Sequence, residues 1–230
     1  MKLIQMPFSH NCIKVRAALA LKKLDHEIQN ISPVDRAPVV AASGQGLVPV
    51  LVDGSRTIAD STAILLYVDE TYPDPPLVPS DPRDRAECVL LEDWADHAFM
   101  ALSRRIAYWN VTSTPGALGR MFFPHDHGWA RRFKERIAIR RVRDRFRISA
   151  SGYARDVPEA RRVAAIAVDR IAGRDHLLDG APTIADLALA SMSAPLVADR
   201  ALREDPAVSA LLAWGARFLP PDVPALYASV

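Results

Sequence analysis

Residues 47–61 read LVPVLVDGSRTIADS, and this stretch decides the fold. An apolar run begins beside Pro49, turns at Asp53-Gly54, resumes in the next few residues and ends at the pair 60–61. The pattern predicts a strand, a hairpin, a second strand and the N-cap of a helix. Because proline donates no hydrogen bond to a sheet, Pro49 marks the point where the chain enters it.

The same stretch offers groups that could bind a peptide. If the peptide bond before Pro49 is cis, the carbonyl and amide of Val48 point out of the sheet and are free to bind another chain. Asp60 and Ser61 place two oxygen-bearing side chains beside the positive end of the following helix. Such a position suits the charged main-chain groups of an amino acid.

Three motifs together resemble the glutathione S-transferase family. They are the Val-Pro hairpin with the acidic-Ser helix start that follows it, residues 6–16 (MPFSHNCIKVR) and residues 182–186 (PTIAD). The resemblance covers the first third of the chain and the late motif. It implies an α+β N-terminal thioredoxin-like domain of order βαβαββα followed by an all-α C-terminal domain, with glutathione as co-substrate and no metal.

Composition limits the other possibilities. The chain has 230 residues, 50% of them hydrophobic, two cysteines and a net charge of +2. This length favours one large domain or two unequal ones. Two distant cysteines and no secretory signal favour a reducing, cytoplasmic location. No apolar run approaches a membrane span, and the small net charge favours neither nucleic acid nor a membrane as a partner.

Proline density locates a domain boundary. Residues 72–82 read YPDPPLVPSDP, which predicts a stiff extended connector. We therefore predict a glutathione-binding domain over 1–76, a linker over 77–82 and a helical co-substrate domain over 83–230.

Hydrophobic periodicity predicts the elements on both sides of this linker. Before it we expect strands at 2–6 and 26–31, parallel because a helix connects them, and helices at 10–23, 35–43 and 61–72. After it we expect helices at 87–109, 129–148, 158–172, 183–197 and 207–218.

Ser9 is the expected catalytic residue. It follows the first strand and precedes a helix, so its hydroxyl lies among unpaired N–H groups at a positive helix end. A bound glutathione thiol would gain thiolate character there, and thiolate is the attacking species. The alternative is that Ser9 only caps the helix, since serine is among the best N-caps.

The two cysteines are expected to be structural. Residues 9–12 have the spacing of a Cys-x-x-Cys motif whose first cysteine is replaced by serine, and the reactive thiol of such a turn is the first one. Cys12 is therefore predicted to pack inside the helix, and Cys88 to lie in the core. A glutathione-dependent thiol-disulfide reductase or peroxidase working through Cys12 is the enzymatic alternative.

The resemblance also implies the glutathione-binding residues. Val48, beside Pro49, would bind the cysteinyl backbone, and Asp60 with Ser61 the γ-glutamyl end. The chain departs from the family at Leu47, where many members carry a lysine for the glycine carboxylate. Gln45 or His10 is expected to compensate, although neither supplies a fixed charge.

The electrophile pocket is expected between Ser9 and the helical domain. By resemblance its candidates are Phe8, Met100, Arg104, Tyr108 and Trp109. Residues 121–123 (MFF) are expected close behind. For each one the alternative is ordinary core packing. Residues 125–127 (HDH) are a weak metal signal, and a solvated loop is favoured.

The segment 131–147 is rich in arginine and could indicate a nucleic-acid patch. It also contains Phe133, Ile137, Val142 and Phe146, which predict an apolar stripe. A solvated or subunit-facing helix is therefore favoured.

The sequence as a whole predicts a detoxification-type transferase. We expect it to join the glutathione thiolate to a small hydrophobic electrophile and, by resemblance, to form a homodimer. The alternative from another class is a non-catalytic binding or assembly protein of the same fold, favoured by Leu47 and by the arginine-rich helix.

Overall fold

A four-stranded sheet forms the N-terminal part of the protein, in a computed structural model that describes residues 1–228. The strands are β1 Lys2–Gln5, β2 Glu27–Asn30, β3 Val50–Asp53 and β4 Arg56–Ala59. Their order across the sheet is β2-β1-β3-β4. β1 and β2 are parallel, as the crossover required, and the pairs β1–β3 and β3–β4 are antiparallel.

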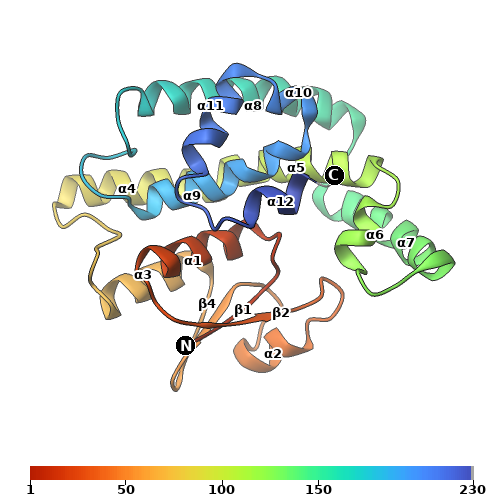
Figure 1. The fold of residues 1–230 in the computed structure, drawn as a ribbon, viewed down its shortest axis with the longest axis horizontal. Coiled ribbons are helices and arrows are strands. Elements are labelled where there is room, and N and C mark those ends of the chain that lie inside the picture. The colour runs from red at the N-terminus through yellow and green to blue at the C-terminus, as the bar shows by residue number, and fades with distance from the viewer. Residues whose placement is uncertain (229–230) are drawn as a thin grey trace.

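Helices cover both faces of this sheet (Figure 1). They are α1 His10–Leu21, α2 Ala37–Ser43 and α3 Ser61–Thr71. Alternate strand residues point to opposite faces. Leu3 and Leu51 pack with α1 and α3, whereas Ile4 and Val50 pack with Val39 of α2. The predicted βαβαββα order is confirmed.

The remainder of the described chain is helical. Its elements are α4 Pro82–Trp94, the π-helical turn η1 Ala95–Phe99, α5 Met100–Ser113, α6 Ala117–Phe122, α7 Gly128–Phe146, α8 Ala150–Ile171, α9 Ile184–Ser193, the 3-10 turn η2 Ala194–Ala198, α10 Arg200–Arg203, α11 Pro206–Gly215 and α12 Val223–Ala228. Figure 1 shows α1 and α3 lying between the sheet and these helices. An all-α part after a thioredoxin-like one is the architecture that the sequence predicted.

The motif at 182–186 opens the central helix of this helical part. Every residue of α9 is buried. The Asp186 carboxylate accepts hydrogen bonds from the amides of Leu177 and Thr183, both at 2.7 Å, and from the Thr183 hydroxyl at 2.8 Å. Three donors satisfy a carboxylate that has no exposed surface. This cap fixes the start of a helix that packs against α1 and α4.

The segment between α3 and α4 has neither helix nor strand. The buried Lys22 Nζ donates to the carbonyls of Tyr72 and Pro75, each at 2.6 Å. The Asp69 carboxylate accepts from the amides of Leu77 and Val78. The proline-rich connector is therefore held against the N-terminal part, and the boundary at 77–82 remains our proposal.

Several predicted helix limits were wrong. The helix expected to begin at Pro158 begins at Ala150, with Ser149 accepting a hydrogen bond from Gly152 N. Its first turns pack against α5, where Tyr153 stacks on Trp109, so tertiary contacts outweigh the cost of a proline inside a helix. The helix expected over 87–109 is divided by η1, and α6, α10 and α12 were not predicted.

Candidate functional site

Three separate segments meet at one end of the sheet. Residue pairing places Ile4 opposite Val50, and Val50 opposite Ala59. The end of β1, the start of β3 and the end of β4 are therefore neighbours. Ser9 follows β1, the pair 48–49 precedes β3, and the pair 60–61 follows β4.

Ser9 occupies the N-cap position of α1 without acting as a side-chain cap. Its φ and ψ are −80° and 121°, and its side chain makes no capping hydrogen bond to a backbone amide of α1. The Ile13 amide donates to the Ser9 carbonyl at 2.9 Å. The hydroxyl instead hydrogen-bonds to the Cys12 thiol. The helix therefore does not use the Ser9 hydroxyl, which stands at its positive end.

Both cysteines are buried and free. Burial raises the pKa of Cys12 to about 11, and the hydrogen bond from Ser9 offsets only part of that rise. Burial also raises the pKa of Cys88. At neutral pH both residues are thiols, which are poor nucleophiles.

The peptide bond between Val48 and Pro49, just before β3, is cis. The loop before it is held by Gln45, whose side-chain oxygen accepts from Leu47 N at 2.5 Å while its nitrogen donates to Leu47 O at 3.0 Å. Leu47 itself is 63% exposed. The Gln45 amide is thus engaged within the loop, and the position of the family's lysine presents an apolar side chain.

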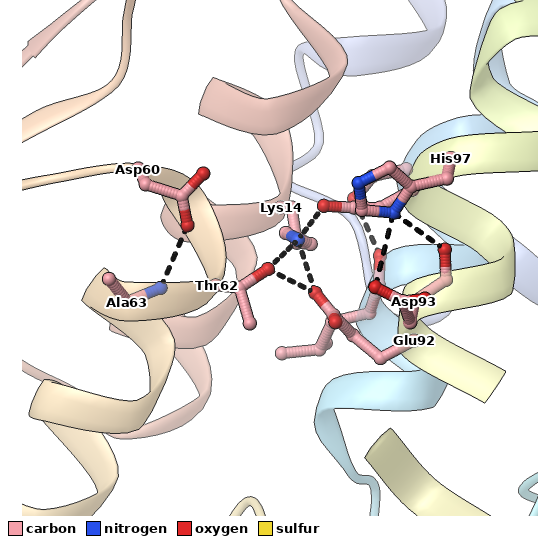
Figure 2. A network of polar contacts seen from close by, with 10 residues as sticks. Lys14, Asp60, Thr62, Ala63, Glu92, Asp93 and His97 are labelled. Atoms are coloured by element: carbon pink, nitrogen blue, oxygen red, sulfur yellow. Dashed lines mark hydrogen bonds and ion pairs between the residues drawn. The ribbon is translucent and has the colours of Figure 1, made fainter. Parts of the chain in front are cut away.

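Asp60 and Ser61 follow β4 at this end of the sheet. Asp60 has φ 84° and ψ 134°, a conformation that L residues rarely adopt and that recurs at ligand-binding sites. Its carboxylate caps α3 by accepting from Ala63 N at 3.0 Å (Figure 2). The Ser61 hydroxyl is buried and has no hydrogen-bond partner within residues 1–228. A buried hydroxyl without a partner is unusual and is satisfied when a ligand supplies one.

His10 is neutral at physiological pH. Burial, followed by the positive charge of Arg104, lowers the pKa of His10 to about 3. Its Nε2 has no hydrogen-bond partner in the part of the chain that the structure describes. His10 therefore offers a polar contact beside Ser9 and no charge.

A buried ion cluster that the sequence analysis missed supports α3. Lys14 of α1 has no exposed surface, and its Nζ lies 2.5 Å from Glu92 Oε1 and 2.6 Å from Asp96 Oδ2. It also lies 3.3 Å from Thr62 Oγ1, which donates to Glu92 at 2.8 Å (Figure 2). The first turn of α3, which contains Ser61, is thereby tied to α1 and α4.

This cluster holds one cation and two carboxylates. Burial raises the pKa of Asp96, and the charge and hydrogen bond of Lys14 oppose that rise. Asp96 lies in η1, the π-helical turn that interrupts the helix between α4 and α5. Helices are widened in this way most often near functional sites. The only sequence signal was Lys14 itself, a charged residue between the apolar Ile13 and Val15.

A cavity of about 800 Å³ opens beside the Ser9 turn. Pro7, Phe8 and residues 30–34 line one side of it, and residues 120–126 the other. Phe8 stacks on Phe122 with ring centroids 5.7 Å apart. Of the five predicted pocket residues, only Phe8 lines this cavity. Met121, Phe122 and Phe123, which the sequence analysis expected close behind the pocket, also line it.

The other four predicted pocket residues lie elsewhere along α5. Met100 packs against the main hydrophobic core. Trp109 stacks on Tyr153 of α8, with centroids 5.3 Å apart. Tyr108 stacks on Phe146 at 5.1 Å, and the Arg104 guanidinium lies 4.6 Å from the centroid of the same ring. Met100 and Trp109 serve helix packing, whereas the charge of Arg104 acts on His10.

The C-terminal helix reaches the same turn. The Tyr227 hydroxyl of α12 donates to the Phe8 carbonyl at 2.8 Å. Burial raises the pKa of Tyr227 well above its ordinary value. Nothing in the sequence linked residue 227 to residue 8, because their contact depends on the whole fold.

The buried face of the arginine-rich helix α7 differs from the apolar stripe that the sequence predicted. It buries Glu135, Ala138 and Val142. Phe133 and Ile137 are 61% and 42% exposed, so they do not share the buried stripe. The Glu135 carboxylate accepts from Gly119 N at 3.0 Å, which turns that face of α7 toward α6.

Two general findings concern the whole described chain. Within residues 1–228, no helix is long and apolar enough to cross a bilayer. The same residues contain no group of three or more His, Cys, Asp or Glu side chains arranged to hold a metal ion. In the segment 125–127, the Asp126 carboxylate forms an ion pair with Lys134 at 2.8 Å.

Comparison with known proteins agrees with this geometry. Residues 3–76 match the family described as glutathione S-transferase, N-terminal domain. The chain is 40% identical over 100 residues to glutathione S-transferase Z2 of Arabidopsis thaliana, a match that covers 40% of this chain and 45% of that protein. It is 38% identical over 76 residues to a probable maleylacetoacetate isomerase of Caenorhabditis elegans, covering 32% and 36% of the two chains.

A solved structure resembles this chain over its whole length. The β-etherase LigF of Sphingobium sp. strain SYK-6 superimposes with a TM-score of 0.71 at 18% identity, covering 100% of this chain and 99% of that one. The protein thus joins a thioredoxin-like domain to an all-helical domain. Its residues 3–76 match the N-terminal domain of glutathione S-transferases, and the whole chain shares the fold of the solved structure. The matched stretch nevertheless spans less than half the length of either curated relative.

Proposed function

We propose that this protein is a glutathione transferase, which binds glutathione at the end of the sheet and presents its thiol at Ser9. The observation that carries the proposal is the convergence of Ser9, the Val48-Pro49 pair and the Ser61 hydroxyl, which has no partner within residues 1–228, on one end of the sheet. The family of residues 3–76 supports glutathione as the ligand.

Each group has a role in this proposal. The backbone of Val48, just before β3, would hydrogen-bond the cysteinyl residue of glutathione. Asp60 and Ser61 would receive the γ-glutamyl ammonium and carboxylate at the start of α3. The Ser9 hydroxyl would then donate to the thiolate, lower its pKa and keep it abundant at neutral pH.

The reaction proposed is nucleophilic attack on an electrophilic carbon. The glutathione sulfur forms a bond to that carbon, and the leaving group departs with the bonding electron pair. Ser9 and the positive end of α1 stabilise the sulfur before attack. The cavity beside Phe8 would accept the apolar body of the co-substrate.

The reductase alternative is less well supported. It needs a reactive Cys12 thiolate, but Cys12 is buried and its pKa is raised to about 11. The non-catalytic alternative makes a different claim about Ser9, namely that its substitution leaves bound glutathione unaffected.

The test is spectroscopic. Glutathione thiolate absorbs in the ultraviolet, so its pKa when bound can be titrated in wild type and in Ser9→Ala. We expect the pKa of the bound thiol to be lower in wild type, and turnover of Ser9→Ala to fall at neutral pH and recover at alkaline pH. Failure of the wild type to bind a glutathione column would reject the transferase and reductase readings together.

We also propose that the protein forms a homodimer. Trp129, Phe133 and Ile137 of α7 recur at intervals of four residues, and all three are exposed. Large apolar side chains exposed along one helix face favour a protein partner. Light scattering of wild type and Phe133→Glu would test it, because a monomeric wild type contradicts the proposal.

A further inference from the structure

Two arginines and a tyrosine gather on one aromatic ring. The guanidinium carbon of Arg104 lies 4.6 Å from the centroid of the Phe146 ring, and that of Arg145 lies 5.7 Å from it. The Tyr108 ring stacks on Phe146 at 5.1 Å. α5 and the end of α7 therefore bring two positive charges to the same place.

This group lies next to the Ser9 turn. The charge of Arg104 acts on His10, the residue after Ser9. Arg36, at the start of α2, donates from Nε to the Pro33 carbonyl at 3.1 Å. Its charge is close enough to interact with Cys12, Tyr108 and Arg145. We call Arg36, Arg104 and Arg145 the arginine cluster.

The arginine cluster has no counter-ion. Within residues 1–228, none of its members forms an ion pair, whereas the neighbouring Arg105 pairs with Asp156 at 2.5 Å. Arg104 Nε is excluded from solvent and has no hydrogen-bond partner in the described chain. Burial lowers the pKa of Arg36 and of Arg104, with further lowering from Arg145 in both.

Such an arrangement is costly unless an anion completes it. A buried donor without a partner destabilises the protein, and converging like charges add to that cost. The planar fork of a guanidinium matches a carboxylate, which can accept two parallel hydrogen bonds from it. The Tyr108 hydroxyl could donate a further one.

We propose that the arginine cluster binds a carboxylate of the co-substrate, so that the small hydrophobic electrophile expected from the sequence carries a negative charge. This inference rests on the proposed transferase function and specifies its substrate class. Arg104 and Arg145 belong to the helical part of the protein, opposite the expected glutathione site. Their carboxylate ligand would orient the electrophilic carbon toward the sulfur at Ser9.

A carboxylate could also come from the glycine of glutathione, since Leu47 leaves that group without a lysine. The two sources predict different responses. If the cluster serves the co-substrate, its substitution changes the preference between charged and uncharged electrophiles. If it serves glutathione, the affinity for glutathione changes and that preference does not.

The kinetic test uses 4-chloro-3-nitrobenzoate and its methyl ester, which differ by the carboxylate charge. In both, sulfur bonds to the ring carbon and chloride leaves with the electron pair. We expect kcat/KM for the acid, divided by that for the ester, to fall by at least about tenfold in Arg104→Gln and in Arg145→Gln. Arg132→Gln is the matched control, because Arg132 is exposed on α7 outside the cluster.

A binding test needs no turnover. Calorimetry with 4-chloro-3-nitrobenzoate alone should detect binding to wild type and to Arg132→Gln, weakened in Arg104→Gln and Arg145→Gln. Because Arg145 is exposed, its variant tests the idea even if Arg104→Gln folds poorly. Binding without any conjugation would reject the transferase proposal and keep the anion site.

Three results would overturn the inference. The first is an unchanged ratio of acid to ester turnover in the two cluster variants. The second is weaker glutathione binding with that ratio unchanged, which would assign the cluster to glutathione. The third is no detectable binding of the benzoate by wild type.

Discussion

Lys14 Nζ and Glu92 Oε1 lie 2.5 Å apart, and neither side chain is open to solvent. The two residues are 78 positions apart, and one belongs to α1 and the other to α4. With Asp96 at 2.6 Å on the same ammonium, this ion cluster lies where the N-terminal and helical parts meet.

Removing the cation should be strongly destabilising. Lys14→Met leaves two buried carboxylates without a partner, so we expect the free energy of unfolding at pH 7 to fall by about 3–5 kcal/mol. Urea denaturation would measure it. The control is Lys2→Met, whose partner Glu27 is exposed and 3.9 Å away, and for which a loss below about 1 kcal/mol is expected.

The free energy of unfolding lost in Lys14→Met should also depend on pH. The pKa of Asp96 is raised in the fold from its ordinary value of 3.8, so folding favours its protonated form. Its contribution to stability is full below 3.8 and is lost as pH rises through the raised pKa. Without Lys14 the pKa rises further, so the difference between Lys14→Met and wild type should shrink on acidification. An equal difference at pH 5 and pH 7.5 would contradict this account.

The contribution of His10 to the free energy of unfolding should change with pH in the opposite direction. Its pKa is lowered in the fold from 6.5 to about 3. Its contribution to stability is present above 6.5 and is lost as pH falls toward 3. Wild type should therefore lose more unfolding free energy between pH 7.5 and pH 5 than His10→Gln does. If NMR shows that the assigned His10 imidazole titrates near 6.5 in the native protein, this account of His10 is wrong.

Cys12 and Cys88 should be unreactive in the native protein. Burial and raised pKa values leave both as thiols near pH 7.5. Intact mass after a short maleimide treatment is expected to show no adduct, and two adducts after denaturation. Cys12→Ser should keep most conjugating activity, with a stability loss of about 1–3 kcal/mol from the buried hydroxyl. A rapid native adduct, or a mixed disulfide of glutathione with Cys12, would favour the reductase.

Asp60 allows the ligand role to be separated from the helix cap. Asp60→Ser keeps an oxygen that can cap α3 and removes the charge, so we expect glutathione affinity to fall by about 1.5–3 kcal/mol with little change in melting temperature. Asp205→Ala is the control, because Asp205 caps α11 through Ala207 and Val208. That variant should lose about 1 kcal/mol of stability and no glutathione affinity. Calorimetry that finds Asp60→Ser equal to wild type would reject the assignment.

Local sequence signals were sufficient for much of this fold. The order of strands and helices in the first 76 residues, the entry of the chain into the sheet at Pro49 and the start of α9 each depend on a few neighbouring residues with strong conformational preferences. The Pro158 helix start was wrong because tertiary packing overrode such a preference. For the candidate site, Ser9, Val48, Asp60 and Ser61 could be named in advance.

The site features that the sequence did not predict share one physical cause. Lys14, Asp96, Arg36, Arg145 and Tyr227 act through contacts between segments far apart in the sequence. Periodicity shows which face of a helix is apolar, but it does not show which charges another helix will bring against that face. The arginine cluster is the clearest case, because its members come from α2, α5 and α7.

The hydrogen bonds that hold the proline-rich connector have a consequence for unfolding. Lys22 donates to two connector carbonyls, and Asp69 accepts from two connector amides. A linker bound at both kinds of backbone group transmits the loss of one domain's structure to the other. Heating should therefore produce one cooperative calorimetric transition instead of two, and Lys22→Met should lower the midpoint of that transition.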